Sequence, residues 1–152
     1  MHEQPHRPQS VPTRIRDRPT WLISRAYARS NGLLHDGFRA GAAGLRSYHY
    51  RLLAALDEWG PASQADLGRS TSIDRSDVVA ALNELEQRGL IKRTVDPANR
   101  RRNIVSITRA GTKQLGVLDH IISDIQERVL APLSAAERRQ FIKLLHRLVD
   151  AD

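Results

Sequence analysis

The sequence predicts a mainly α-helical fold of the α+β class with one β-hairpin. Three observations lead to this prediction. Apolar residues recur at helical spacing over most of the chain from Thr20 to Leu148. Residues 90–107 instead form two β-rich stretches around a turn. Ser72 to Thr108 joins a capped helix directly to that hairpin.

Length and composition limit the classes of protein that fit. The chain has 152 residues, enough for one domain, and its 24 Lys and Arg against 17 Asp and Glu give a net charge of +7. A polyanion is therefore the natural partner. The chain has no cysteine, which excludes disulfides, thiolate metal sites and cysteine-based redox sensing. No apolar run approaches the roughly 18 residues of a membrane span, and we expect a soluble, cytoplasmic protein with no membrane role.

The N-terminal segment, residues 1–19, differs from the rest of the chain. It holds four of the seven prolines, several arginines and no apolar periodicity. We expect a basic, proline-rich arm that is either loose or strapped across a partner subunit, with its first ten residues disordered. Residues 20–152 are expected to form a single domain.

Two helices are predicted before residue 60. Thr20 is a plausible cap for a helix running to about Ala40, softened at Gly32 and Gly37. The second helix covers 47–58 and ends at the strong stop Trp59-Gly60-Pro61. Its predicted apolar stripe consists of Tyr50, Leu53, Ala54 and Leu56.

A helix-turn-helix follows. Ser63 caps a short helix, 64–69, in which Ala65 and Leu67 are expected to pack inward, and 70–73 form the turn. The next helix is capped by Asp74, has Asp77 at its third position and ends at Gly89. Its core stripe is Val78, Leu82 and Leu85, at i, i+4 and i+7. The residues expected to face outward are Arg75, Ser76, Asp77, Val79, Ala80 and Asn83.

Residues 90–95 and 103–107 are predicted to pair as antiparallel strands around a turn at 96–101. This hairpin makes a wing, and the lobe 61–109 becomes a winged helix-turn-helix. Arg100, Arg101 and Arg102 are expected at the turn, where one guanidinium can enter a narrow minor groove while others hold phosphates. A solvated charged tip is the alternative.

Two helices complete the chain. One runs from 110 to 130 with Thr108 as its cap, and a capping box at Ser134 and Glu137 opens the other. Both helices carry apolar residues along one face and are too long for a small lobe to bury that face. We therefore expect residues 20–60 and 110–152 to form a helical dimerisation region of a homodimer. The alternative is that the helices fold back on their own lobe.

The order of these elements, with the motifs "DRS", "LEQRGLI", "DPANRR" and "ITRAG", resembles the MarR family of winged-helix transcription regulators over about residues 22–148. The resemblance implies a homodimeric repressor of a pseudo-palindromic operator, released by a small aromatic or phenolic carboxylate. It also implies that Arg101 enters the groove. The family pattern has Asp where this chain has Asn99, and that Asp braces the following arginine, so we expect a less rigid wing.

Side-chain chemistry supports double-stranded DNA as the partner. A helix fits the major groove, where each base pair shows a distinct pattern of hydrogen-bond donors and acceptors. Arg75 and Ser76 sit in the first turn, and Val79 and Ala80 offer methyl surface to thymine. Asp77 could cap the helix, hold Arg75 or accept from a cytosine amino group, with capping preferred. Weaker candidates for phosphate contacts are Arg69, Lys92 and Arg93.

Candidates for ligand binding lie on the first two helices. A cation near aromatic rings suits a carboxylate, and Arg25, His35, Tyr48 and His49 are the residues proposed for such a pocket. Each has a structural alternative: an intersubunit salt bridge for Arg25, packing for Tyr48, and a hydrogen-bonded spacer for either histidine.

Enzyme and metal chemistry find no support in the sequence. No nucleophile elbow, phosphate-binding glycine loop or recognisable acid-base pair is present, and no cofactor is implied. The histidines show no metal-binding spacing; His120 and Asp124 are the only local pair. Two functions of different class remain: a ligand-responsive repressor, and an architectural or partner-docking DNA-binding protein without a sensor.

Overall fold

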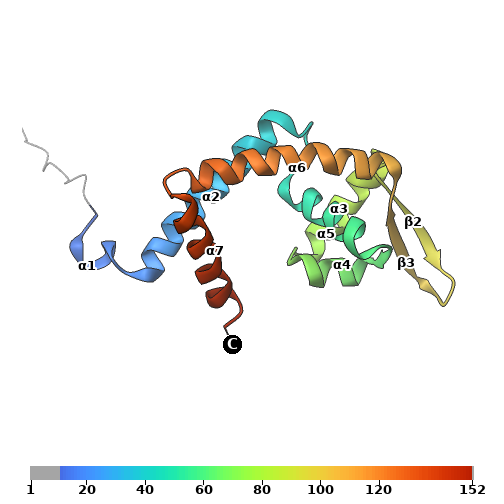
Figure 1. Cartoon of the computed structure of the whole chain (residues 1–152). Helices are drawn as coiled ribbons and strands as arrows, with labels where there is room; N and C mark the ends of the chain where they lie inside the picture. Colours follow the sequence, from blue (N-terminus) through green and yellow to red (C-terminus); the bar gives the residue numbers. More distant parts are fainter. Residues whose placement is uncertain (1–10, 152) are drawn as a thin grey trace, which may run out of the picture.

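Helix α6 (Arg109–Leu130) connects the two parts of the molecule in the computed structural model, which describes residues 11–151 (Figure 1). At one end of α6 lie the sheet and helices α3 (Ser47–Trp59), α4 (Gln64–Thr71) and α5 (Arg75–Gln87). Helix α2 (Pro19–Gly41) runs beside the other half of α6, and α7 (Ala135–Val149) turns back from its end. The predicted mainly helical α+β fold is confirmed.

Helix α2 is continuous through both glycines that were expected to soften it. Gly37 is where α2 meets α6: a Cβ built there would lie 2.6 Å from Cδ1 of Ile125. The glycine therefore permits close packing of the two helices. The predicted Thr20 cap is wrong, because the helix starts one residue earlier at Pro19, whose fixed φ suits a first helical position.

A short helix, α1 (Thr13–Arg16), lies within the segment predicted to be an irregular arm. Its backbone continues through the turn at Asp17 into α2. The structure of 11–19 is thus more regular than expected, while the disorder predicted for the first ten residues falls outside the described part of the chain.

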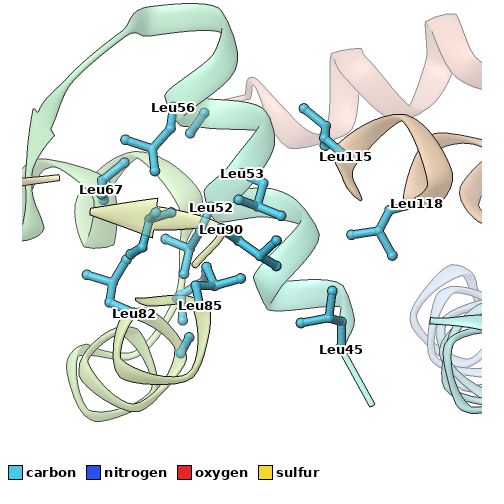
Figure 2. Close-up of a cluster of buried hydrophobic side chains, with 14 of the residues drawn as sticks. Leu45, Leu52, Leu53, Leu56, Leu67, Leu82, Leu85, Leu90, Leu115 and Leu118 are labelled. Carbon is cyan, nitrogen blue, oxygen red and sulfur yellow. The ribbon is translucent and has the colours of Figure 1, made fainter. Parts of the chain in front are cut away.

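The core of the lobe is built mainly from leucines of α3, α4, α5 and α6 (Figure 2). Leu52, Leu53 and Leu56 of α3 are fully buried, as are Leu82 and Leu85 of α5. The predicted stripe of α3 is confirmed at Leu53 and Leu56, whereas Tyr50 and Ala54 are only half-buried. Because each buried leucine contributes about 1.5–3 kcal/mol of transfer free energy, this cluster is the main stabilising element of the lobe.

The helix-turn-helix forms as predicted, with small differences. The Ser63 hydroxyl caps α4 by accepting the Asp66 amide N–H (3.2 Å), and α4 runs two residues further, to Thr71. Leu67 is buried, but Ala65 is exposed, contrary to prediction. The turn into α5 passes through Ser72 in the left-handed region, with φ +52°.

Helix α5 buries Val78, Leu82 and Leu85, as predicted. Asp74 stands at the N-cap position, but its side chain makes no capping hydrogen bond, so that part of the prediction is wrong. The helix ends through Gly89, at φ +68°, and the Leu90 N–H donates to the Leu85 carbonyl (2.9 Å), a Schellman-type closure.

The wing is longer than predicted. Strands β2 (Ile91–Asp96) and β3 (Asn99–Ile107) pair antiparallel, and Pro97 and Ala98 alone make the turn between them. The three arginines expected at the turn therefore lie on β3. A further two-residue strand, β1 (Ala62–Ser63), pairs with the other edge of β3 and was not predicted.

The caps of the last two helices are confirmed. Thr108 Oγ1 accepts the Gly111 amide N–H (3.0 Å), and Ser134 and Glu137 form the predicted capping box. Helix α7 buries none of its residues, and the side chain of Leu148 is 64% exposed. Between residues 11 and 151, no helix is long and apolar enough to cross a membrane.

Candidate nucleic-acid interface

A cleft of about 630 Å³ lies between the helix-turn-helix and strand β3 of the wing. Residues of α4, the turn, the start of α5 and β3 line it, and four of them are arginines: Arg69, Arg75, Arg101 and Arg102. The fold thus brings together basic residues up to 33 positions apart in the chain. Such a concentration of guanidinium groups at the start of a helix favours binding of phosphate groups.

The outward face of α5 is exposed as predicted: Arg75, Ser76, Asp77, Val79, Ala80 and Asn83 all lie at the surface. Val79 is an exposed apolar side chain on this face. Asp77 forms no side-chain hydrogen bond or ion pair with the rest of 11–151. Its carboxylate therefore neither caps the helix nor holds Arg75 in this structure.

Arg69 is held by a neighbour on its own helix. Its guanidinium forms a close ion pair with the Asp66 carboxylate, which also accepts a hydrogen bond from the Ser63 hydroxyl (2.5 Å). The Ser63 hydrogen bond and the nearby arginine hold the pKa of Asp66 below its usual value. Asp66 therefore stays ionised and keeps its ion pair with Arg69, which lines the cleft.

A buried carboxylate that was not predicted, Asp96, stabilises the wing. The side chain of Asp96 is buried; it accepts the Ala98 amide N–H (2.9 Å) and pairs with Arg102 (2.6 Å). These two hydrogen bonds lower the pKa of Asp96. Asn99 Oδ1 accepts the Arg101 amide N–H (3.1 Å). The expected loss of rigidity at Asn99 is thus offset, because Asp96 holds Arg102 and Asn99 closes the turn.

Arg93 is engaged by residues of α5. Its guanidinium donates to Glu86 through Nε (3.0 Å) and Nη2 (2.5 Å), and to Asn83 Oδ1 (2.7 Å). Lys92, one residue earlier, is exposed. Of the two weaker candidates on β2, the structure leaves Lys92 free to meet DNA and engages Arg93 within the lobe.

The four candidate ligand residues do not come together in one pocket in the described chain. Arg25 is exposed, with its guanidinium 5.8 Å from the ring centre of Trp21 on the same helix. His35 is exposed beside Asp36. Tyr48 is half-buried, with its ring centre 4.5 Å from that of His49.

His49 is fully buried, and both ring nitrogens face protein groups. Nδ1 accepts the Arg46 amide N–H (2.9 Å), which caps α3. Nε2 lies 2.8 Å from Glu84 Oε2 of α5, without an aligned hydrogen bond. Burial lowers the pKa of His49, and the neighbouring Glu84 partly opposes this. His49 is thus the hydrogen-bonded spacer that the sequence left open, joining α3 to α5.

The supporting carboxylates were not predicted, because an acidic residue beside a basic face gives no sequence signal for which basic side chain it contacts. They are Asp66, Glu84, Glu86 and Asp96. Asp96, which directly precedes the turn Pro97-Ala98, is the exception: aspartate is a common first residue of a turn. In residues 11–151, no three metal-ligating side chains cluster.

A helix-turn-helix followed by a basic wing, with an arginine-lined cleft between them, defines a winged-helix DNA-binding protein. The model of the MarR family matches residues 43–102, which include the whole helix-turn-helix and most of the wing. The chain belongs to the MarR family of transcription regulators, as its sequence motifs predicted.

Three relatives extend this result. The transcriptional repressor NicR of Pseudomonas putida is 29% identical over 94% of this chain and 89% of its own. The structure of Bordetella bronchiseptica BpsR, whose DNA binding is regulated by 6-hydroxynicotinic acid, is 27% identical over 93% of this chain and all of its own, with a TM-score of 0.81. The regulator PcaV of Streptomyces coelicolor, solved with its natural ligand, is 27% identical over 93% of this chain and 97% of its own, with a TM-score of 0.75.

Proposed function

We propose that this protein is a homodimeric transcriptional repressor that binds a pseudo-palindromic operator and releases it when a small aromatic or phenolic carboxylate binds. The observation that carries the proposal is the arginine-lined cleft between α5 and the wing. It joins a helix that fits the major groove to a hairpin that can reach the adjacent minor groove.

In this proposal α5 reads the bases. Arg75 and Ser76 contact bases or phosphates from the first turn, and Val79 and Ala80 offer methyl groups to thymine. Asp77, which makes no capping bond, accepts from a cytosine amino group. The remaining proposed contacts are those of Asn83 in the same groove, Arg101 in the minor groove, and Arg69, Lys92, Arg100 and Arg102 on phosphates.

The dimer is supported by apolar side chains that the single chain leaves exposed. They lie near the start of α2 and along α7: Leu22, Ile23, Tyr27, Ile142, Leu144, Leu145, Leu148 and Val149. Exposed apolar surface on two helices favours a subunit interface. Two lobes related by a two-fold axis would place their recognition helices about 34 to 36 Å apart, one turn of DNA.

The effector class is supported by relatives and by Arg25. DNA binding by BpsR responds to 6-hydroxynicotinic acid, an aromatic carboxylate. Arg25 carries its charge beside the Trp21 ring, and this pairing of a cation with an aromatic face suits such a ligand.

The test has two stages. First, the full chain is titrated with DNA from upstream of its own gene. The preformed complex is then titrated with a panel of aromatic and phenolic acids. We expect at least one acid to lower DNA affinity and to raise the melting temperature of the free protein. If no acid changes either quantity while specific binding holds, the architectural function without a sensor is favoured.

Arg25→Ala separates the sensor from the DNA-binding lobe. We expect this variant to bind the operator like the parent but to resist release by the active acid. The matched control is Arg29→Ala, one turn further along α2, where Arg29 donates to the Arg128 carbonyl (3.2 Å). Loss of the dimer in Arg25→Ala would favour the intersubunit salt bridge instead.

A further inference from the structure

Arg93 joins the wing to the recognition helix. Its backbone N–H donates to Glu86 Oε1 (3.2 Å), while its guanidinium donates to Glu86 Oε2 and to Asn83 Oδ1. Both partners lie on α5, three residues apart and therefore on one face, whereas Arg93 lies on β2. The Arg93 side chain is only 21% exposed.

Both oxygens of the Glu86 carboxylate accept hydrogen bonds from Arg93. One oxygen holds the backbone of β2 and the other holds the guanidinium, and the hydrogen bond from Arg93 lowers the pKa of Glu86. Because the bidentate contact involves both main chain and side chain, it fixes the position of β2 against α5 as well as the rotamer of Arg93. Strand β3, which carries Arg101, is paired with β2 and is fixed with it.

The same contact sets the orientation of the Asn83 amide. A guanidinium donates only, so the atom of Asn83 that faces Arg93 is the oxygen, and the Nδ2 donors point away from it. Asn83 is exposed on the face of α5 that carries Ser76, Val79 and Ala80. Bidentate reading of adenine by asparagine needs both its oxygen and its nitrogen. With the oxygen held, Asn83 presents donors to the groove.

We propose that Arg93 is a positioning residue for DNA recognition: with Glu86 it locks the wing to the recognition helix, and with Asn83 it turns the amide donors toward acceptors on the operator. This inference rests on the proposed DNA-binding function. It differs from the sequence-based assignment of Arg93 as a phosphate contact, and the two roles predict different responses to salt.

The experiment compares Arg93→Gln with the parent on operator and random duplex over a range of salt concentrations. Each phosphate contact contributes about 0.9 to the slope of log K against log salt. We expect Arg93→Gln to bind the operator at least tenfold more weakly, to change little on random duplex and to keep the parental slope. In the matched control Arg101→Gln, we expect the dependence of log K on log salt to be less steep on both duplexes.

Two results would overturn the inference: a weaker slope in Arg93→Gln with equal losses on both duplexes, or unchanged operator affinity. If the parent itself does not prefer the operator, the proposed function fails instead, so the two failures are distinct. Since Arg93→Gln leaves Glu86 unpaired and could destabilise the lobe, the double variant Glu86→Gln with Arg93→Gln, which leaves no unpaired charge, is measured as well. Loss of operator preference in the double variant at a parental melting temperature supports a positioning role; parental operator preference contradicts it.

Discussion

At the scale of single residues, the basic face divides into arginines that are held and arginines that are free. Arg69, Arg93 and Arg102 each pair with a carboxylate of the lobe. Arg75 and Arg101 have no such ion pair within 11–151, and both line the cleft. Arg75 and Arg101 can therefore bind DNA without giving up an ion pair of the lobe, whereas a phosphate contact by Arg69 or Arg102 competes with the carboxylate that each one pairs with.

Arg101→Ala tests this division. Its side chain is exposed and only its backbone N–H is held, so we expect operator binding to weaken by about 1 to 3 kcal/mol with an unchanged melting temperature. Lys113→Ala removes one positive charge from the exposed surface of α6 and should leave binding near the parental value. Parental affinity in Arg101→Ala would remove Arg101 from the interface.

His49 gives the lobe a pH dependence. Its folded-state pKa lies below the ordinary value of 6.5 because the imidazole is buried, so unfolding takes up a proton. The stability from neutral His49 is complete above pH 6.5 and is lost as pH falls through the folded-state pKa. Glu84 favours the charged ring, while Arg46 and Arg88 oppose it.

We therefore expect the melting temperature of the parent to fall between pH 7.5 and 5.5 more than that of His49→Gln, whose amide oxygen can still cap α3. The carboxylates with lowered pKa values titrate below this range and do not contribute. Thermal unfolding at both pH values measures the difference. Parallel curves for parent and variant would show that the buried ring does not set the dependence.

At the scale of elements, α6 depends on one glycine at its start. A Cβ at Gly111 would lie 2.0 Å from the Leu90 carbonyl oxygen, where β2 begins beside the helix. The crowded neighbour is backbone and cannot move away without disturbing the joint between wing and α6. Gly116, one to two turns later, has no atom within 4 Å of such a Cβ.

Gly111→Ala should therefore destabilise the protein by on the order of 1 to 3 kcal/mol, as overpacking does. Gly116→Ala should stabilise it by about 0.5 to 1 kcal/mol, because alanine is the better helix former. Denaturant unfolding of both variants measures the two changes. A Gly111→Ala variant as stable as the parent, or stabilised like Gly116→Ala, would contradict the packing described at Gly111.

Most elements could be predicted because their signals are local. The caps Ser63, Thr108 and Ser134 and the core stripe of α5 depend on residues within one or two turns. Strand β1 has only two residues and forms because β3 offers a free edge, which no local pattern shows. The contacts of Arg93 and His49 are made with residues of α5 that are distant in the sequence, so no local pattern predicts them.

At the scale of the whole molecule, the exposed apolar face of α7 predicts a dimer. Leu148→Glu places a charge in this face and should convert the parent, expected at twice the 17.1 kDa chain mass, to monomer with loss of operator binding. The control Gln140→Glu adds the same charge at an exposed polar position of α7. Light scattering after size exclusion measures the mass; a monomeric parent that still binds the operator tightly would contradict the dimer.

The central claim is that the cleft and the outward face of α5 recognise a particular DNA sequence. The most direct test is competition, at one physiological salt concentration, between DNA from upstream of the gene and random duplex of equal length for the full chain. We expect a preference of about 10³-fold or more for the specific site, as sequence-specific binders show. A ratio near one, with both duplexes bound, would contradict the claim and leave only nonspecific attraction to the basic face.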